Sequence, residues 1–401
     1  MLRPGHGVAL LTIALLVIGV VMVNSTGLLV GANVPPVTHQ SVFLGVPAIH
    51  ALLAVGALFL GAWVSLRRIE TLRGFAAPAP WALGLAVLLL LLVWLPNTGR
   101  TINSSHRWIE LGGIRFQASE AAKWALPFFL AWFCTRPQVQ IERFWRGLVP
   151  VLALIGFVTL LIAIEDLGTA VLVGGVAMLV LLAAGARLLH MALLAPLGLL
   201  ALVGGIIAEP YRWRRLTTYV DPFADPEGGG WHIIQSLRAI AGGGLAGRGL
   251  GAGEQKFDLT SDTTDFIFSI ICEELGFLGA GLVITAFVAL LLCGLSIITD
   301  RRSDLSSGTG QAERSELFMR LLGLGILLTV GMQALFNILV TTALVPTKGI
   351  ALPLISRGGT GWILTAFCLG LLLAIERSRL RTREKPTQQQ TVIERGEAVL
   401  L

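Results

Sequence analysis

The sequence predicts an all-α, polytopic membrane protein of ten transmembrane helices with a large extracytoplasmic loop between the seventh and eighth. Of its 401 residues, 55% are hydrophobic and only 13% are charged, whereas a soluble protein carries ~25% charged residues. Mean hydropathy is +0.79. Apolar runs at 8–23, 48–64 and 81–95 approach the ~20 residues that cross a bilayer as a helix. We therefore expect one membrane domain over residues 1–385.

The predicted spans follow the apolar runs in order. No small-residue cleavage site follows the first run, so we expect a retained helix and not a signal peptide. The eighth run is too long for a simple span, and we expect a break near Gly276 and Gly279. The ten predicted spans are residues 8–24, 47–65, 81–96, 118–134, 147–164, 169–185, 188–208, 266–298, 317–343 and 354–375.

The distribution of basic residues predicts the orientation. Ten spans put both termini on one side, and that side holds 18 of the 30 Lys and Arg residues. Cytoplasmic loops of membrane proteins carry an excess of Lys and Arg. Both termini are therefore predicted to be cytoplasmic, and the polar tail 386–401 is predicted to be disordered.

The other cations gather mainly in two outward segments, 100–123 and 212–256, against this rule, and an anionic ligand would explain them. In the first segment, Ser119 is a plausible N-cap of the fourth helix. Glu120 and Lys123 are three residues apart and can pair on one helix face. Ionisable residues inside a span predict a functional site; the alternative is a structural pair that neutralises itself.

The segment 209–265 is the large outer loop. Its glycine-rich part, GGGLAGRGLGAG (242–253), predicts a backbone that approaches a ligand closely, although these glycines could also only make turns. WHIIQSLRAIA (231–241) predicts a short amphipathic helix on the membrane surface. Loops of this length inside compact proteins are usually functional or disordered, and several aromatic residues argue against disorder.

A third outward piece, 337–362, combines helix breakers with cations. Irregular backbone at membrane depth is tolerated where it lines a cavity or is buried in protein, so this piece predicts part of a site; a plain connecting turn is the alternative. The residues that support this view are Pro346, Lys348, Gly349, Pro353, Arg357, Gly358 and Gly359.

Asp265 is predicted to lie at the membrane edge on the same outer side. One carboxylate among cations is suited to accept a proton from a substrate hydroxyl, and Arg and Lys are suited to hold phosphate. No His or Cys residues have metal-ligand spacing, so no metal site is predicted. A divalent cation such as Mg²⁺ or Mn²⁺ between Asp265 and a phosphate is left open. The residues alone name neither the sugar nor the lipid nor the reaction.

Four sequence motifs point to a known family. RWIELGGIRFQASEAAK (107–123), EDLGTA (165–170), GGGLAGRGLGAGEQK with TDFIFSIICEELGFLGA (242–280), and PTKGIALPLISRGGT (346–360) resemble, in order, the motifs of the SEDS family. This is the family of membrane peptidoglycan polymerases typified by FtsW and RodA. EQKF, EELG and PTKG-x-x-LPLIS look more like FtsW and WHIIQS more like RodA, and we lean towards FtsW.

The resemblance implies a function and a location. The enzyme would polymerise lipid II in the bacterial inner membrane, in cell division or elongation. An N-acetylglucosamine hydroxyl of the acceptor would attack the anomeric carbon of the donor N-acetylmuramic acid, releasing undecaprenyl pyrophosphate. We expect a class B penicillin-binding protein as partner and no nucleic acid. Two rival functions are a lipid II flippase and a non-catalytic scaffold that activates the penicillin-binding protein.

The resemblance also implies site residues. The family's essential aspartate corresponds to Asp265, as general base. The residues implied in substrate binding and site integrity are Arg107, Arg115, Glu120, Lys123, Gln235, Lys256, Ser356 and Gly358.

The sequence departs from the family pattern at three places. LTSDTTDF (259–266) replaces LPE-x-H-TDF, with Asp262 as a helper or a solvated residue. Ala118 replaces the proline of QPSE, and Arg357 replaces the tyrosine of SYGG. Further along, Glu273 and Glu274 would lie about 12–14 Å beyond Asp265 along a helix. We expect one of them to pair with a cation or cap a break, and the other to face a polar cavity.

Overall fold

The computed structural model describes residues 3–26, 45–72, 74–94, 99–102, 105–111, 114–257, 259, 265–300 and 310–397. Within these ranges only the backbone is described at 99–102, 105–108, 110–111, 114–115, 257 and 381–397. Asp262 and most of LTSDTTDF lie outside the described residues, as do the side chains of Arg107 and Arg115.

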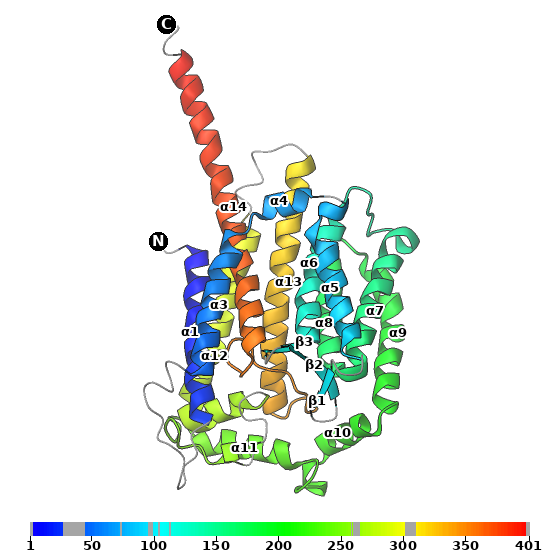
Figure 1. Ribbon diagram of the computed structural model, residues 1–401, viewed down its shortest axis with the longest axis vertical. Coiled ribbons are helices and arrows are strands. Elements are labelled where there is room, and N and C mark those ends of the chain that lie inside the picture. Colours follow the sequence, from blue (N-terminus) through cyan, green and yellow to red (C-terminus); the bar gives the residue numbers. More distant parts are fainter. Residues whose placement is uncertain are drawn as a thin grey trace.

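The described chain is mainly a bundle of long helices, and one helix lies over each predicted span (Figure 1). By length and composition, seven helices of the described part could cross a membrane, and two further apolar helices are shorter. The long helices are α1 (Pro4–Thr26), α3 (Val46–Trp63), α5 (Pro78–Leu92), α6 (Ala118–Cys134), α7 (Val149–Glu165), α8 (Leu167–Ala183), α9 (Leu188–Ile207), α12 (Ile267–Thr299), α13 (Gly310–Thr341) and α14 (Gly359–Glu397).

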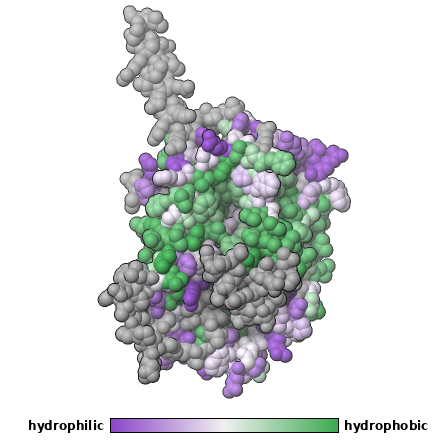
Figure 2. All heavy atoms as spheres, in the orientation of Figure 1, coloured by the Kyte–Doolittle hydropathy of each residue, from purple (hydrophilic) through white to green (hydrophobic). Residues whose placement is uncertain are grey.

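Both termini lie at one end of the bundle, and α10 (Pro210–Val220) and α11 (Trp231–Gly243) cover the opposite end (Figure 1). Hydrophobic residues form a band around the middle, with hydrophilic residues towards both ends (Figure 2). This pattern is typical of a protein whose middle faces lipid. Short elements complete the fold: α4 (Leu66–Thr71), η1 (Gly74–Ala76), the π-helix η2 (Phe144–Leu148), η3 (Pro222–Ala224) and η4 (Gln255–Phe257).

One expectation about secondary structure needs correction. An antiparallel sheet, β1 (Gly99–Ile102), β2 (Ser105–Leu111) and β3 (Ile114–Gln117), precedes α6, so the fold is not purely helical. Trp108 lies opposite Gln117 in its register. The signal was present, because a Gly-Gly pair between two runs with β-branched and aromatic residues favours a hairpin. At the other end, α14 continues to Glu397, and the disordered tail expected at 386–401 stays a prediction.

The predicted break in the eighth span is confirmed at Gly276, whose φ of +66° interrupts α12. The glycine-rich loop packs its backbone against this break. A methyl group at Gly276 would lie 2.7 Å from the Ala246 carbonyl carbon, and one at Gly247 would lie 2.6 Å from the Gly276 nitrogen. These glycines therefore allow close packing of loop against helix, which corrects the expectation that they expose the backbone to a ligand.

Glu273 ties the same loop to α12. Its side chain is 1% exposed and accepts hydrogen bonds from the backbone N–H groups of Glu254 (2.9 Å) and Gln255 (3.2 Å). Arg248 lies 3.9 Å away, and its backbone N–H donates to the Glu273 carbonyl (3.0 Å). One carboxylate was expected to pair with a cation, and Glu273 does so as a structural group.

Glu274 also pairs with a cation, where the second carboxylate was expected to face a polar cavity. It is fully buried, accepts a hydrogen bond from Ser25 Oγ of α1, and lies 3.5 Å from Lys256 Nζ. Lys256 Nζ also donates to the carbonyls of Ser25 (3.1 Å) and Gly251 (2.7 Å). A buried charge is tolerated when it is paired and hydrogen-bonded in this way. Together these contacts fasten α1, the loop and α12 to one another.

Helices α3 and α14 come into very close contact where two glycines face each other. A methyl group at Gly61 would lie 3.1 Å from Gly370 Cα and still closer to the Phe367 carbonyl oxygen. A methyl group at Gly370 would lie 3.0 Å from the Ala62 nitrogen. Small residues allow such close approach of helix backbones, on which association in membranes depends.

Candidate functional site

Asp265 lies two residues before the start of α12 and is held there through its backbone. Asn337 Nδ2 donates to the Asp265 carbonyl at 2.8 Å and to the Ile350 carbonyl at 2.7 Å. The half-buried carboxylate lies beside Gly349, where a methyl group would be only 3.0 Å from Oδ2. Asp265 and the loop between α13 and α14 are therefore fixed relative to each other by one fully buried amide.

Gln333 holds the same loop one helical turn earlier in α13. Its Nε2 donates to the Ala351 carbonyl at 2.8 Å, and its Oε1 accepts from Lys123 Nζ at 2.7 Å. Gln333 and Asn337 were not among the predicted site residues. Their spacing of four, which puts both amides on one face of a largely apolar helix, was the available signal.

The predicted pair of Glu120 and Lys123 forms at 2.7 Å, and its side chains are 16% and 2% exposed. Lys123 contacts Glu120 and Gln333 together, so its ammonium group is engaged by protein on at least two sides. A path of contacts therefore joins α6, α13 and the loop that reaches Asp265. This geometry favours a positioning role for Lys123 over direct contact with a substrate.

Breaking this pair is expected to destabilise the fold strongly. Lys123→Met leaves the Glu120 carboxylate without its cation, and loss of one partner from a buried pair costs about 3–5 kcal/mol of unfolding free energy. The double variant Glu120→Gln/Lys123→Met removes both charges and is expected to recover part of that loss. Thermal unfolding of the three purified proteins measures both effects, and equal melting temperatures for wild type and Lys123→Met would contradict the structural role.

Two motifs far apart in sequence meet beside Asp265. A methyl group at Gly168 of EDLGTA would lie 3.3 Å from Lys348 Cδ of PTKG, so the lysine stem packs on the start of α8. Asp166 caps that helix by accepting from the Thr169 N–H (3.1 Å) and Oγ1 (2.9 Å). Arg215 of α10 contacts the Thr347 carbonyl at 3.4 Å. The loop beside Asp265 therefore carries Lys348 and is contacted by Arg215 of α10, and such cations are suited to an anionic ligand.

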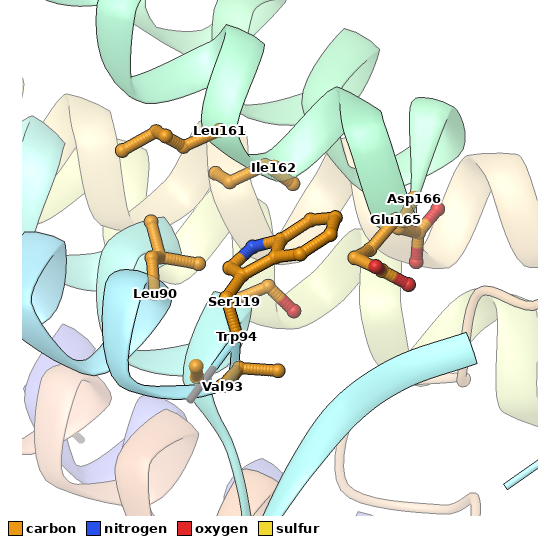
Figure 3. A pocket seen from close by; sticks show the side chains of 9 residues that line it. Leu90, Val93, Trp94, Ser119, Leu161, Ile162, Glu165 and Asp166 are labelled. Carbon is orange, nitrogen blue, oxygen red and sulfur yellow. The ribbon is translucent and has the colours of Figure 1, made fainter. Parts of the chain in front are cut away.

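A small pocket lies next to these motifs, between α5, α6 and α7. Figure 3 shows the Trp94 indole in the middle of the view, with Leu161 and Ile162 above it and Glu165 and Asp166 beside it to the right. The pocket is apolar for most of its lining and acidic at one edge. Among the described residues, no group of three or more His, Cys, Asp or Glu side chains could hold a metal ion.

The remaining predicted residues fall into two groups. Ser356 and Gly358 stabilise the loop beside Asp265, and the others lie elsewhere. Ser356 is buried, and its Oγ accepts from the Leu352 N–H at 2.6 Å, while its carbonyl accepts from Trp362 Nε1 at 2.7 Å. The Gly358 carbonyl accepts from the Trp362 N–H at 2.9 Å. Both residues shape the loop that carries Gly349.

Gln235 is buried in α11, beside Ser236, whose Oγ donates to the Thr341 carbonyl at 2.7 Å. Arg115 lies on β3 opposite Glu110, five residues before Glu120, and Arg107 lies on β2. Lys256 belongs to the buried contacts with Glu274 and is not brought to Asp265 by any described contact.

Arg212 shows that not every outward cation faces a ligand. Its guanidinium is buried and donates to the carbonyls of Ala163 and Ile164, both at 2.9 Å, and of Gly205 at 2.8 Å. A cation at the C-terminal end of α7 pairs with the free carbonyl groups there and interacts favourably with the helix dipole. The basic residues of segment 212–256 therefore include structural ones, which charge counting did not separate.

Comparison with known proteins identifies a matching family. Residues 7–381 match the family model of FtsW, RodA and SpoVE, described as a cell cycle protein. Stage V sporulation protein E of Bacillus subtilis is 39% identical over 291 residues, covering 72% of this chain and 76% of that protein. A probable peptidoglycan glycosyltransferase FtsW of Alkalilimnicola ehrlichii is 36% identical over 389 residues, covering 94% and 90%.

Two solved structures share the fold. A chain from a peptidoglycan synthase complex, studied for the coordination of polymerization and crosslinking, has a TM-score of 0.69 and 26% identity, covering 93% of this chain and 97% of that one. The rod shape determining protein RodA of Thermus thermophilus has a TM-score of 0.62 and 26% identity, covering 93% and 96%.

Proposed function

The chain belongs to the FtsW, RodA and SpoVE family and is a peptidoglycan glycosyltransferase, and from this premise we propose that Asp265 is its general base. The observation that carries the proposal is the position of the Asp265 carboxylate against Gly349, in the loop that also carries Lys348. A carboxylate that accepts a proton beside cations that hold an anion is an arrangement suited to transfer from a pyrophosphate carrier.

The proposed substrates are lipid II and the growing glycan on undecaprenyl pyrophosphate. A hydroxyl of the lipid II acceptor attacks the anomeric carbon of the glycan donor, and Asp265 takes the hydroxyl proton. The bond from that carbon to the pyrophosphate oxygen breaks, and undecaprenyl pyrophosphate leaves with the bonding electrons. Lys348 and Arg215, with Arg107 and Arg115 from the sheet, are assigned to the negative charge that develops on the leaving group.

The other predicted residues take supporting roles in this proposal. Glu120 and Lys123 hold the loop through Gln333, and Ser356 and Gly358 give that loop its shape. Gln235, which is buried in α11, is a structural residue of that helix in this proposal. Lys256 holds the glycine-rich loop to α12 through Glu274.

We further propose that ten helices span a bacterial inner membrane with both termini in the cytoplasm. The band of hydrophobic residues in Figure 2 and the basic residues of the terminal end support this orientation. The site then faces the extracytoplasmic side, where glycan strands are made.

The proposed partner is a class B penicillin-binding protein. A similar chain works within a peptidoglycan synthase complex that couples polymerization to crosslinking, and a transferase of this kind needs a crosslinking enzyme. The relatives named FtsW favour a role in cell division over elongation.

A flippase is the alternative, and the buried charges argue against it. Such a transporter needs a polar path through the bilayer, but the described carboxylates Glu120, Glu273 and Glu274 are all engaged in contacts with protein. The deciding experiment incubates the purified protein and its partner with lipid II and resolves the products by size. Glycan ladders support the transferase, whereas lipid translocation across vesicles without polymer would support the flippase.

A further inference from the structure

His232, the second residue of α11, lies against the start of α12. Its imidazole stacks on Phe266, with ring centroids 5.7 Å apart and planes 19° apart. Phe266 directly follows Asp265 in the chain. A ring from the outer surface helix therefore covers the residue next to the proposed base.

The Nδ1 atom of His232 is buried and has no hydrogen-bond partner among the described residues. Leaving a buried polar atom without a hydrogen-bond partner is unfavourable, and the great majority of buried polar atoms in proteins have one. Because His232 lies next to the proposed substrate site, a group of the bound substrate would supply the missing hydrogen-bond partner of Nδ1.

Burial and then the Arg215 guanidinium lower the pKa of His232. The imidazole is therefore neutral at physiological pH, so that one ring nitrogen can accept a hydrogen bond while the other donates. A neutral ring suits contact with an uncharged sugar group, whereas the neighbouring Arg215 and Lys348 suit phosphate.

We propose that Nδ1 of His232 hydrogen-bonds a hydroxyl or amide group of the sugar that is bound at Asp265, and so orients it for reaction. This role rests on the proposed glycosyltransferase site and assigns it a sugar-recognising residue from α11. Proton transfer itself stays with Asp265.

Matched substitutions separate the nitrogen from the ring. His232→Phe keeps an aromatic ring on Phe266 and removes both nitrogens. His232→Asn keeps a polar atom near the place of Nδ1, whereas His232→Gln places one near Nε2. His190→Phe is the control, because Nδ1 of His190 is also buried without a described partner and its ring also packs on an aromatic residue, Phe144, with centroids 5.1 Å apart. His190 lies on α9, at the end of the bundle that holds the termini.

The full-length variants, each with the penicillin-binding protein partner, are assayed for lipid II polymerisation over a range of substrate concentrations. His232→Phe and His232→Gln are expected to raise KM about 3- to 10-fold with a smaller change in kcat, as for loss of one neutral hydrogen bond. His232→Asn is expected to restore most of the wild-type KM, and His190→Phe to match wild type.

Two results would overturn the proposal. One is a KM for His232→Phe within twofold of wild type; the other is equal impairment of the Asn and Gln variants, which would indicate packing alone. If His232→Phe fails to fold in a thermal unfolding assay, the Asn and Gln comparison decides. A wild-type protein without polymerase activity would instead refute the proposed function, which distinguishes that failure from this one.

Discussion

Replacing Asp265 with Asn is expected to abolish lipid II polymerisation, with kcat lowered by at least ~100-fold. The amide has nearly the same shape as the carboxylate but cannot accept the hydroxyl proton, and general base catalysis contributes about 10²- to 10⁴-fold. Folding should be little affected, because the Asn337 side chain binds the backbone carbonyl of residue 265, which the substitution leaves unchanged. Gel analysis of glycan products under saturating lipid II measures the effect.

Asp221→Asn is the matched control for that experiment. Asp221 is an exposed carboxylate on the same end of the molecule, where it caps η3 by accepting from the backbone N–H groups of Phe223 (3.1 Å) and Ala224 (3.2 Å). An asparagine can still cap in this way, so activity should stay near wild type. Normal polymerisation by Asp265→Asn would refute the base assignment and favour the scaffold function.

Adding a methyl group at Gly61 is expected to destabilise the contact between α3 and α14. The methyl of Gly61→Ala would meet the backbone of α14 at Gly370 Cα (3.1 Å) and, closer still, at the Phe367 carbonyl. A backbone cannot move aside as a side chain can, so α3 and α14 must separate. Overpacking of this kind costs about 1–3 kcal/mol or more.

Gly56→Ala provides the comparison on the same helix. It lies five residues earlier in α3, with nothing within 4 Å of the position of an added methyl group. Thermal unfolding of the purified variants in one detergent should show a clear fall in melting temperature for Gly61→Ala and none for Gly56→Ala. Equal melting temperatures for both variants would mean that the α3–α14 contact is looser than described.

The sequence predicted those features that depend on local pattern. Apolar runs located the helices, and a glycine in the eighth run marked the break at Gly276. The Glu120–Lys123 pair was predicted from its spacing and is confirmed, whereas the role of Asp265, inferred from its motif, stays a prediction. The sheet before α6 was missed because its three strands are short and lie next to a long apolar run that dominates the pattern.

Features that depend on three-dimensional contacts could not be predicted from the sequence. Lys256 and Lys348 both belong to outward segments rich in glycine, yet one is buried against Glu274 and the other packs on the start of α8. Arg212 caps α7 from 49 and 48 residues away along the chain, through its bonds to the carbonyls of Ala163 and Ile164. Residue type and local spacing carry no information about which distant carbonyl or carboxylate a cation meets.

The break at Gly276 has a mechanical consequence for Asp265. The stretch of α12 before the break, which starts just after Asp265, is fastened to the glycine-rich loop by Glu273 and Glu274, while the stretch after the break continues through the bundle. The segment that carries Asp265 is therefore held from three sides: by the glycine-rich loop through Glu273, by Ser25 of α1 through Glu274, and by Asn337 of α13. A change in any one of these elements would reach the carboxylate through a single hydrogen-bonded contact.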